Sequence, residues 1–196
     1  MDTEKTKKNS TTSFWYDIIE VCAISVVIVL LIFTFVARLS TVEGNSMNNT
    51  LQNGDRLVVS NLFYTPKTGD IVVFQQSDGY FKEPLIKRVI AVGGQTLKID
   101  FNNWAVYVDG VKLDETYVKR ELAADMNREN FYTYYGAVLD ENGVLTIPEG
   151  YVFVMGDNRN ASSDSRFAGV GLVSESDIMG KAVFRLFPFS KIGTVE

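Results

Sequence analysis

The run IKRVIAV, residues 86–92, is rich in β-branched side chains and ends at the turn signal Gly93-Gly94. β-Branched side chains pack well on a pleated surface, and adjacent glycines mark turns. Further short runs rich in β-branched or aromatic residues lie at 56–59, 70–74, 105–108 and 151–154. Because such runs between turn residues are typical of strands, we predict a mostly β domain beyond residue 38.

Two local features refine this prediction. The dipeptide Asp109-Gly110 favours the positive φ angles of a two-residue turn, so a tight hairpin is expected between 107–108 and 111–113. Residues 114–142 are more polar and irregular than their surroundings. We expect them to form an insertion or an exposed loop structure, not a second folded domain, with one helical piece over 117–130.

The N-terminal region predicts a membrane anchor. VCAISVVIVLLIFTFVA, residues 21–37, carries no charge, and the aromatic residues of 14–16 precede it. A bilayer core needs roughly 20 apolar residues, which the two segments together supply. Lys5, Lys7 and Lys8 lie before the segment and only Arg38 lies directly after it. This bias places the N-terminus in the cytoplasm and the β domain outside.

Two alternatives to an anchor remain open. A cleaved secretory signal usually has an apolar core of ~7–15 residues and an Ala-x-Ala-like site, whereas this run is longer and ends in FVAR, residues 35–38. A buried helix of a soluble protein usually has a polar face, which this segment lacks. We therefore divide the chain into a cytoplasmic tail (1–13), a transmembrane anchor (14–37) and an extracytoplasmic domain (38–196).

The composition excludes several classes of site. The net charge of −5 gives no reason to expect nucleic-acid binding. Cys22 is the only cysteine and lies in the apolar run, so the chain cannot form an internal disulfide. The chain has no histidine, which also excludes zinc sites of the Cys/His kind. No metal or cofactor is implied.

The absence of histidine restricts how a serine could act as a nucleophile. Its base must then be a lysine or a carboxylate, and Ser46 and Lys87 form a candidate pair. On a strand, alternation places Lys87 among apolar neighbours, and burial there would lower its pKa toward the range of a general base. Arg88 has equally apolar surroundings on the other face, but an arginine cannot act as the base.

The stretch GDNRNASSDSR, residues 156–166, holds two acids, two arginines and three serines. A turn-rich surface loop would account for its Asp, Asn, Gly and Ser content. The density of charge favours a second interpretation, in which Asp164 pairs with Arg166 and Asp157 pairs with another arginine. Such pairs would hold a catalytic site rigid.

Three blocks of the chain, in this order, resemble bacterial type I signal peptidases: SMNNTL (46–51), GDIVVF to IKRVI (69–90) and GDNRNASSDSRFAG (156–169). With the anchor, they cover most of the chain. The resemblance implies a signal-peptidase-like β catalytic domain after one transmembrane helix. It also implies a membrane-bound serine endopeptidase that removes signal peptides from exported preproteins.

The resemblance also implies roles for individual residues. Ser46 resembles the nucleophile, Lys87 the general base and Ser162 the hydroxyl that orients the lysine. Asp164 with Arg166, and Asp157 with Arg88, resemble the supporting ion pairs. The walls of shallow apolar pockets that select small side chains are expected to be Met47, Leu51, Leu85 and Ile86.

The nucleophile block departs from the family pattern at three positions. Asn45 and Asn49 stand where the family usually has glycine and proline. Asn45 is expected to tolerate a positive φ, and loss of the proline is expected to loosen the loop. In the family the nucleophile's N–H stabilises the oxyanion, sometimes with a hydroxyl two residues earlier, where this chain has Gly44.

Two rival functions remain. A signal-peptidase-like assembly factor for pilus biogenesis would bind its substrate with little hydrolysis. A self-cleaving protease of the repressor-processing kind would be cytosolic, which the anchor contradicts. The expected partners are preproteins with small residues before the cleavage site and membrane lipid, with pilin or secretion machinery as further candidates and no nucleic acid.

Overall fold

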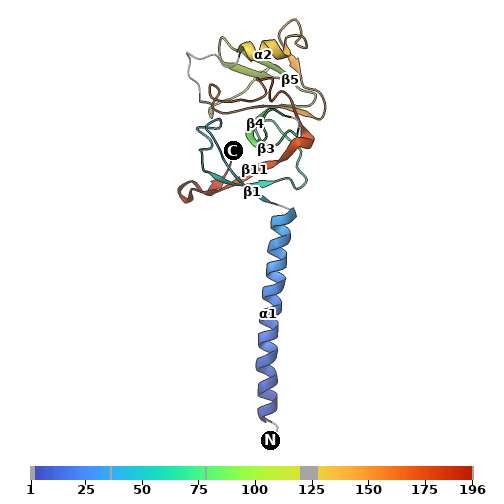
Figure 1. Cartoon of the computed structure of the whole chain (residues 1–196), viewed down its shortest axis with the longest axis vertical. Helices are drawn as coiled ribbons and strands as arrows, with labels where there is room; N and C mark the ends of the chain where they lie inside the picture. The colour runs from blue at the N-terminus through green and yellow to red at the C-terminus, as the bar shows by residue number, and fades with distance from the viewer. Residues whose placement is uncertain (1–2, 36, 78, 120–127, 196) are drawn as a thin grey trace. The chain divides into compact units, whose positions relative to one another are not determined.

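The computed structural model describes residues 3–35, 37–77, 79–119 and 128–195. The chain divides into two compact units, Met1–Arg38 and Leu39–Glu196. The first contains one helix, α1 (Thr3–Phe35) (Figure 1). Its segment Ser13–Leu30 is long and apolar enough to cross a membrane, and none of it is buried within the protein. A buried core helix would be covered by other residues, so that alternative is not supported.

The second unit is mostly β, as predicted. Its larger sheet has the strand order β1-β2-β11-β3-β4-β9-β10, with β12 paired to β11. The strands are β1 (Arg38–Thr41), β2 (Arg56–Ser60), β3 (Ile71–Phe74), β4 (Leu85–Val92), β9 (Tyr151–Met155), β10 (Val173–Ser174), β11 (Ile178–Phe187) and β12 (Gly193–Thr194). Two 3-10 turns flank β11, η1 (Glu175–Asp177) and η2 (Phe189–Lys191).

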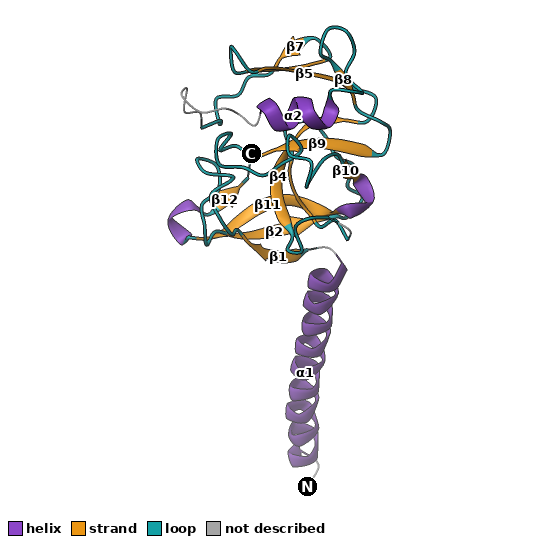
Figure 2. Ribbon diagram, turned by 45° about the horizontal axis from the view of Figure 1, so that its top comes forward, coloured by secondary structure: helices purple, strands orange, loops and turns teal. Residues whose placement is uncertain are grey.

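A smaller sheet has the order β7-β6-β5-β8 and lies at one end of the unit beside α2 (Arg128–Tyr135) (Figure 2). Its strands are β5 (Thr96–Asp100), β6 (Ala105–Val108), β7 (Val111–Lys112) and β8 (Leu145–Thr146). The β6–β7 turn confirms the predicted hairpin. Asp109 and Gly110 both have positive φ, 51° and 76°, as a type I′ turn requires.

Residues 114–142 differ in part from the expectation of an exposed loop. Phe131 and Tyr135 of α2 are buried in a core that joins the small sheet to β4 and β9. The helix expected over 117–130 is not found at 117–119, which are not helical, and residues 120–127 lie outside the described ones. Among the described residues of this region, the helix covers Arg128–Tyr135, and its packed side chains are Phe131 and Tyr135.

The larger sheet is buried on both faces where it supports the site. In β3, Ile71 and Val73 belong to one apolar cluster, whereas Val72 and Phe74 belong to another. Neighbouring β4 carries Ile86 in the first cluster and Val89 in the second. Any polar side chain on this part of β4 is therefore held in a dry environment and needs a defined partner.

Candidate active site

Ser46 lies in the turn-rich segment between β1 and β2. Backbone hydrogen bonds from Thr50 and Leu51 to the Met47 carbonyl, 3.1 and 2.9 Å long, close a compact turn after it. Asn158 fixes the other side: its N–H donates to the Ser46 carbonyl (2.9 Å), and its side-chain amide donates to the Asn45 carbonyl (3.1 Å). The 156–166 loop therefore holds the backbone of the candidate nucleophile.

Lys87 reaches Ser46 from β4. Its Nζ lies 2.8 Å from Ser46 Oγ, although the two residues are 41 positions apart, and it also donates to the Ile86 carbonyl at 3.0 Å. Lys87 is only 3% exposed. The structure thus brings together the hydroxyl and the amine that the sequence suggested as a pair.

Burial lowers the pKa of Lys87 from its ordinary value to about 8. The nearby positive charge of Arg166 also lowers it, while the carboxylates of Asp164 and Asp157 raise it. A buried amine with this pKa is neutral in roughly one molecule in ten at pH 7, and this neutral form can accept a proton from a serine.

The Asp164–Arg166 pair lies in the same loop and is completely buried. Arg166 Nε and Nη2 contact the two carboxylate oxygens at 2.8 and 2.7 Å, a bidentate arrangement. Burial alone would raise the pKa of Asp164, but Arg166, the Gly156 N–H and the Ser162 hydroxyl hold that pKa below its usual value. Asp164 therefore remains ionised beneath the site.

Gly156 allows the loop to approach the nucleophile. A Cβ at this position would collide with Ser162 Oγ and would lie 2.5 Å from the Ser46 carbonyl oxygen. Ser162, which is 5% exposed, is thus packed in the same small region as the backbone of Ser46. Only a residue without a side chain fits between them.

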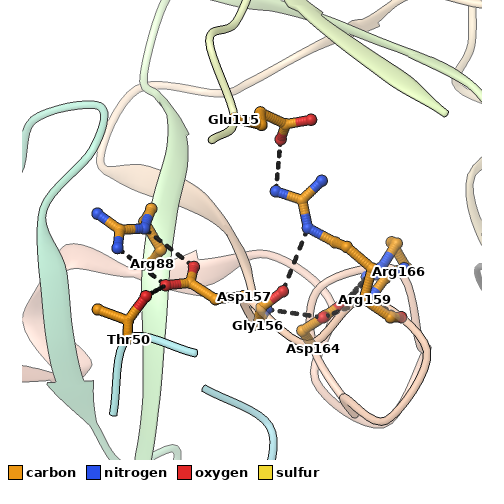
Figure 3. Close-up of polar contacts among 8 residues, drawn as sticks. All are labelled: Thr50, Arg88, Glu115, Gly156, Asp157, Arg159, Asp164 and Arg166. Atoms are coloured by element: carbon orange, nitrogen blue, oxygen red, sulfur yellow. Dashed lines mark hydrogen bonds and ion pairs between the residues drawn. The ribbon is translucent and has the colours of Figure 1, made fainter. Parts of the chain in front are cut away.

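The second expected ion pair joins β4 to the same loop (Figure 3). Arg88 Nε and Nη2 contact Asp157 Oδ1 and Oδ2 at 2.9 and 2.8 Å, and Arg88 Nη1 donates to the Gly69 carbonyl at 2.8 Å. Asp157 also accepts a 2.5 Å hydrogen bond from the Thr50 hydroxyl. This contact attaches the segment after Ser46 to the pair, and the sequence alone did not indicate it.

A third buried ion pair, Arg159 with Glu115, was also absent from the sequence-based predictions (Figure 3). The two side chains are 0% and 2% exposed, and Arg159 Nε donates to the Gly156 carbonyl at 3.2 Å. Arg159 was visible in the charged loop, but its partner lies 44 positions away in the irregular region. Only the unmatched charge of Arg159 could have indicated that a partner was needed.

A pocket of about 320 Å³ opens at the dyad and is lined by residues of three segments. They are Ser40, Thr41, Glu43, Gly44, Asn45, Ser46, Glu83, Pro84, Leu85, Ile86, Lys87, Ala161 and Ser163. Leu85 and Ile86 are therefore pocket residues. Met47 and Leu51 are not: they are 1% and 0% exposed and pack in the core with β2 and β3. Their apolar side chains point into the protein because the turn after Ser46 needs a buried anchor.

The expected location of a positive φ angle, at Asn45, was also wrong. Asn49, not Asn45, has a positive φ, 87°. Asn49 therefore occupies a left-handed conformation that asparagine tolerates and proline cannot adopt. The backbone at position 49 therefore has a conformation that a proline would not permit.

Comparisons with known proteins identify the family of the chain. The family described as signal peptidase, peptidase S26, matches residues 15–187. A probable signal peptidase I-1 of Synechocystis sp. is 38% identical over 179 residues, which cover 87% of this chain and 81% of the relative. Signal peptidase IB of Staphylococcus aureus is 35% identical over 176 residues, covering 86% and 87%.

A crystal structure of a signal peptidase I from Enterococcus faecalis aligns with a TM-score of 0.44 and 27% identity over 61% of this chain and 98% of that chain. The assignment of the family depends on the sequence matches, which span nearly all of the β unit and part of α1. They confirm the resemblance and indicate a serine protease. The chain belongs to the signal peptidase I family, peptidase family S26.

Proposed function

We propose that the chain is a membrane-bound endopeptidase that removes signal peptides from exported preproteins with a Ser46–Lys87 dyad. The observation that carries the proposal is the 2.8 Å approach of Lys87 Nζ to Ser46 Oγ in a buried setting. Membership of the signal peptidase I family supports cleavage of signal peptides as the activity.

The dyad would act in two stages. Ser46 Oγ attacks the scissile carbonyl carbon while neutral Lys87 takes the hydroxyl proton. The C–N bond then breaks, and Lys87 returns the proton to the departing amine, leaving the signal peptide esterified to Ser46. In the second stage Lys87 removes a proton from water, the resulting hydroxide attacks the ester, and the proton returns to Ser46.

The tetrahedral intermediates carry a negative oxygen that needs hydrogen-bond donors. The backbone N–H of Ser46 makes no hydrogen bond within the described part of the chain. This N–H is our candidate donor, in agreement with the family resemblance. Gly44 adds no side-chain donor, so this chain would depend on backbone groups.

The pocket suggests how a substrate would bind. Leu85–Lys87 of β4 pair with β3 on one side, whereas β9 pairs only with β4 residues from Arg88 onward. The other edge of Leu85–Lys87 thus has no strand partner among the described residues, and it lines the pocket. An extended peptide could add to such an edge through backbone hydrogen bonds. Leu85 and Ile86 would then limit the side chains before the scissile bond to small ones.

The apolar helix and the relatives indicate a membrane-anchored protein. We infer that α1 crosses the membrane once, with the lysine-rich N-terminus in the cytoplasm. Ser46 follows the helix end, Phe35, by few residues, so the site would be tethered near the outer membrane surface. A preprotein held in the same membrane by its signal peptide would share that location.

The assembly-factor alternative is not favoured, because the relatives described above are named as signal peptidases. The test uses the full chain in detergent and a preprotein with an Ala-x-Ala site. We expect cleavage after the second alanine by the wild type and none by Ser46→Ala. Absence of cleavage by the wild type, or equal cleavage by both, would refute the proposal.

A further inference from the structure

The segment from Glu115 to Lys119, here called the strap, is covalently part of the small-sheet region but contacts the charged loop beside the dyad. It follows β7 and precedes α2. Glu115 contacts the loop by an ion pair with Arg159, and Lys119 contacts it by backbone hydrogen bonds. Between them, the Tyr117 ring packs on Arg88 of β4, the partner of Asp157 in the loop. No catalytic role described above uses it.

Tyr117 covers the buried Arg88–Asp157 pair. The Arg88 guanidinium carbon lies 3.9 Å from the centre of the Tyr117 ring, which is the distance of direct stacking. The guanidinium edges are occupied by Asp157 and by the Gly69 carbonyl, so the ring packs on a flat face that has no hydrogen-bonding group of its own. The ring therefore keeps water from an ion pair that is 4% and 0% exposed.

The strap backbone adds to the loop like a short strand. Lys119 N–H donates to the Asp157 carbonyl at 2.9 Å, and Arg159 N–H donates to the Lys119 carbonyl at 3.2 Å. These bonds flank Asn158, with which Lys119 forms a parallel bridge. Asn158 is the residue that holds the Ser46 carbonyl.

Glu115 neutralises Arg159 in the same loop, 2.5 Å away. The Arg159 carbonyl in turn accepts a 2.9 Å hydrogen bond from Arg166, which pairs with Asp164. The strap is thus linked to both buried ion pairs beside the dyad. It contacts the Arg88–Asp157 pair directly, and it is linked to the Asp164–Arg166 pair through Arg159.

We infer that the strap is a positioning element for the dyad and that Tyr117 is its principal positioning residue. This inference rests on the proposed peptidase function. Tyr117 contacts neither Ser46 nor Lys87 through any hydrogen bond or ring contact in the described chain, so it acts through Arg88 and Asp157. Removing the ring admits water to the pair and frees Asp157, Asn158 and hence Ser46 to move relative to Lys87.

The test compares Tyr117→Ala, Tyr117→Leu and Tyr117→Phe in the full chain, with kcat and KM for a cleaved preprotein and the thermal unfolding temperature as readouts. The alanine and leucine variants should lower kcat by on the order of tenfold or more with KM unchanged, because small displacements of reacting groups are costly. Phenylalanine keeps the flat ring and should retain wild-type kcat. Tyr132→Ala is the matched control, since the Tyr132 ring lies beside Arg128 within α2 and does not line the pocket at the dyad.

The wild-type measurement separates the two proposals: an inactive wild type refutes the peptidase function itself. With an active wild type, the inference is overturned if both Tyr117→Ala and Tyr117→Leu keep full kcat. It is also overturned if Tyr117→Phe is as impaired as alanine, or if the kcat losses only follow the loss of folded protein and recur in Tyr132→Ala.

Discussion

The backbone N–H of Asn158 donates a 2.9 Å hydrogen bond to the carbonyl oxygen of Ser46. The candidate nucleophile is thus held through its own backbone by the loop that carries the buried ion pairs. Lys87 comes from a different element, β4, whose position is fixed by two apolar clusters. The distance between hydroxyl and amine therefore depends on how the loop packs against the sheet.

We predict that Ser46→Ala and Lys87→Ala each reduce preprotein cleavage by several orders of magnitude. The two groups act as a unit, so the double variant should be no worse than either single one. Lys87→Arg should also be inactive, because a guanidinium stays protonated and cannot accept the serine proton. Turnover assays with thermal unfolding as a folding control measure this; substantial cleavage by folded Lys87→Ala would contradict the dyad.

The pH dependence follows from the Lys87 pKa of about 8, which burial lowers from its ordinary value. The neutral amine is the active form, so protonation at lower pH removes activity. We expect kcat/KM to rise about tenfold per pH unit below this pKa and to level off above it. Initial rates from roughly pH 6 to 10 at low substrate concentration test whether kcat/KM rises with pH. A flat profile with chemistry rate-limiting would exclude a lysine base.

Asn49→Pro should lower both stability and cleavage rate. The φ of Asn49 is 87°, whereas proline fixes φ near −65°, so the substitution forces the turn after Ser46 into another conformation. A loss larger than about 1 kcal/mol is expected for such a mismatch. Asn49→Gly is the control and should remain close to wild type. Faster cleavage by the proline variant, measured on the same preprotein, would show that this backbone path is wrong.

Two ion pairs on β11 should differ in their contribution to stability. Arg185 with Asp55 is largely buried, with side chains 12% and 3% exposed, and Arg185 also donates to the Thr50 carbonyl at 2.7 Å. Arg185→Ala leaves the Asp55 carboxylate buried without this partner and should cost about 3–5 kcal/mol. Lys181 is 37% exposed in its pair with Asp70, so Lys181→Ala should cost about 0–1 kcal/mol. Denaturant unfolding of the solubilised chain measures both, and equal losses would contradict this ranking.

Membrane topology gives a prediction independent of catalysis. A protease added outside spheroplasts should digest the β unit and spare the tail that contains Lys5 and Lys8, because the lysine bias keeps that tail inside. Antibodies against tags at the two ends identify the fragments. Protection of the β unit, or a mature N-terminus near Arg38, would contradict the retained anchor.

The sequence predicted the strands that are short, apolar and flanked by turn residues, such as β3, β4 and β9. It did not lead us to β11, the longest strand, because its pairings contain register shifts and it includes Gly180, Lys181 and Arg185. Bulges interrupt the alternation on which strand prediction depends. β11 pairs with β2 and β3, which are far from it in the sequence. Such pairing produces no pattern within the sequence of one strand.

Within the candidate site, the charged residues could be found from the sequence but their geometry could not. Alternation gave Lys87 and Arg88 equally apolar surroundings, and both are indeed 3% exposed. Their partners, a serine for one and Asp157 for the other, depend on long-range packing. The inward direction of Met47 was missed for a similar reason, because a turn residue carries no periodic pattern that distinguishes core from pocket.

The open edge of β4 has a consequence for which proteins could be cut. Backbone hydrogen bonding to Leu85–Lys87 requires a client segment whose own N–H and C=O groups are not already engaged. Helices and sheets within a folded domain do not meet this requirement, whereas a disordered connecting segment does. This edge would thus select segments that are locally unfolded. Folded exported domains would not be cleaved, even where their sequences contain suitable small residues.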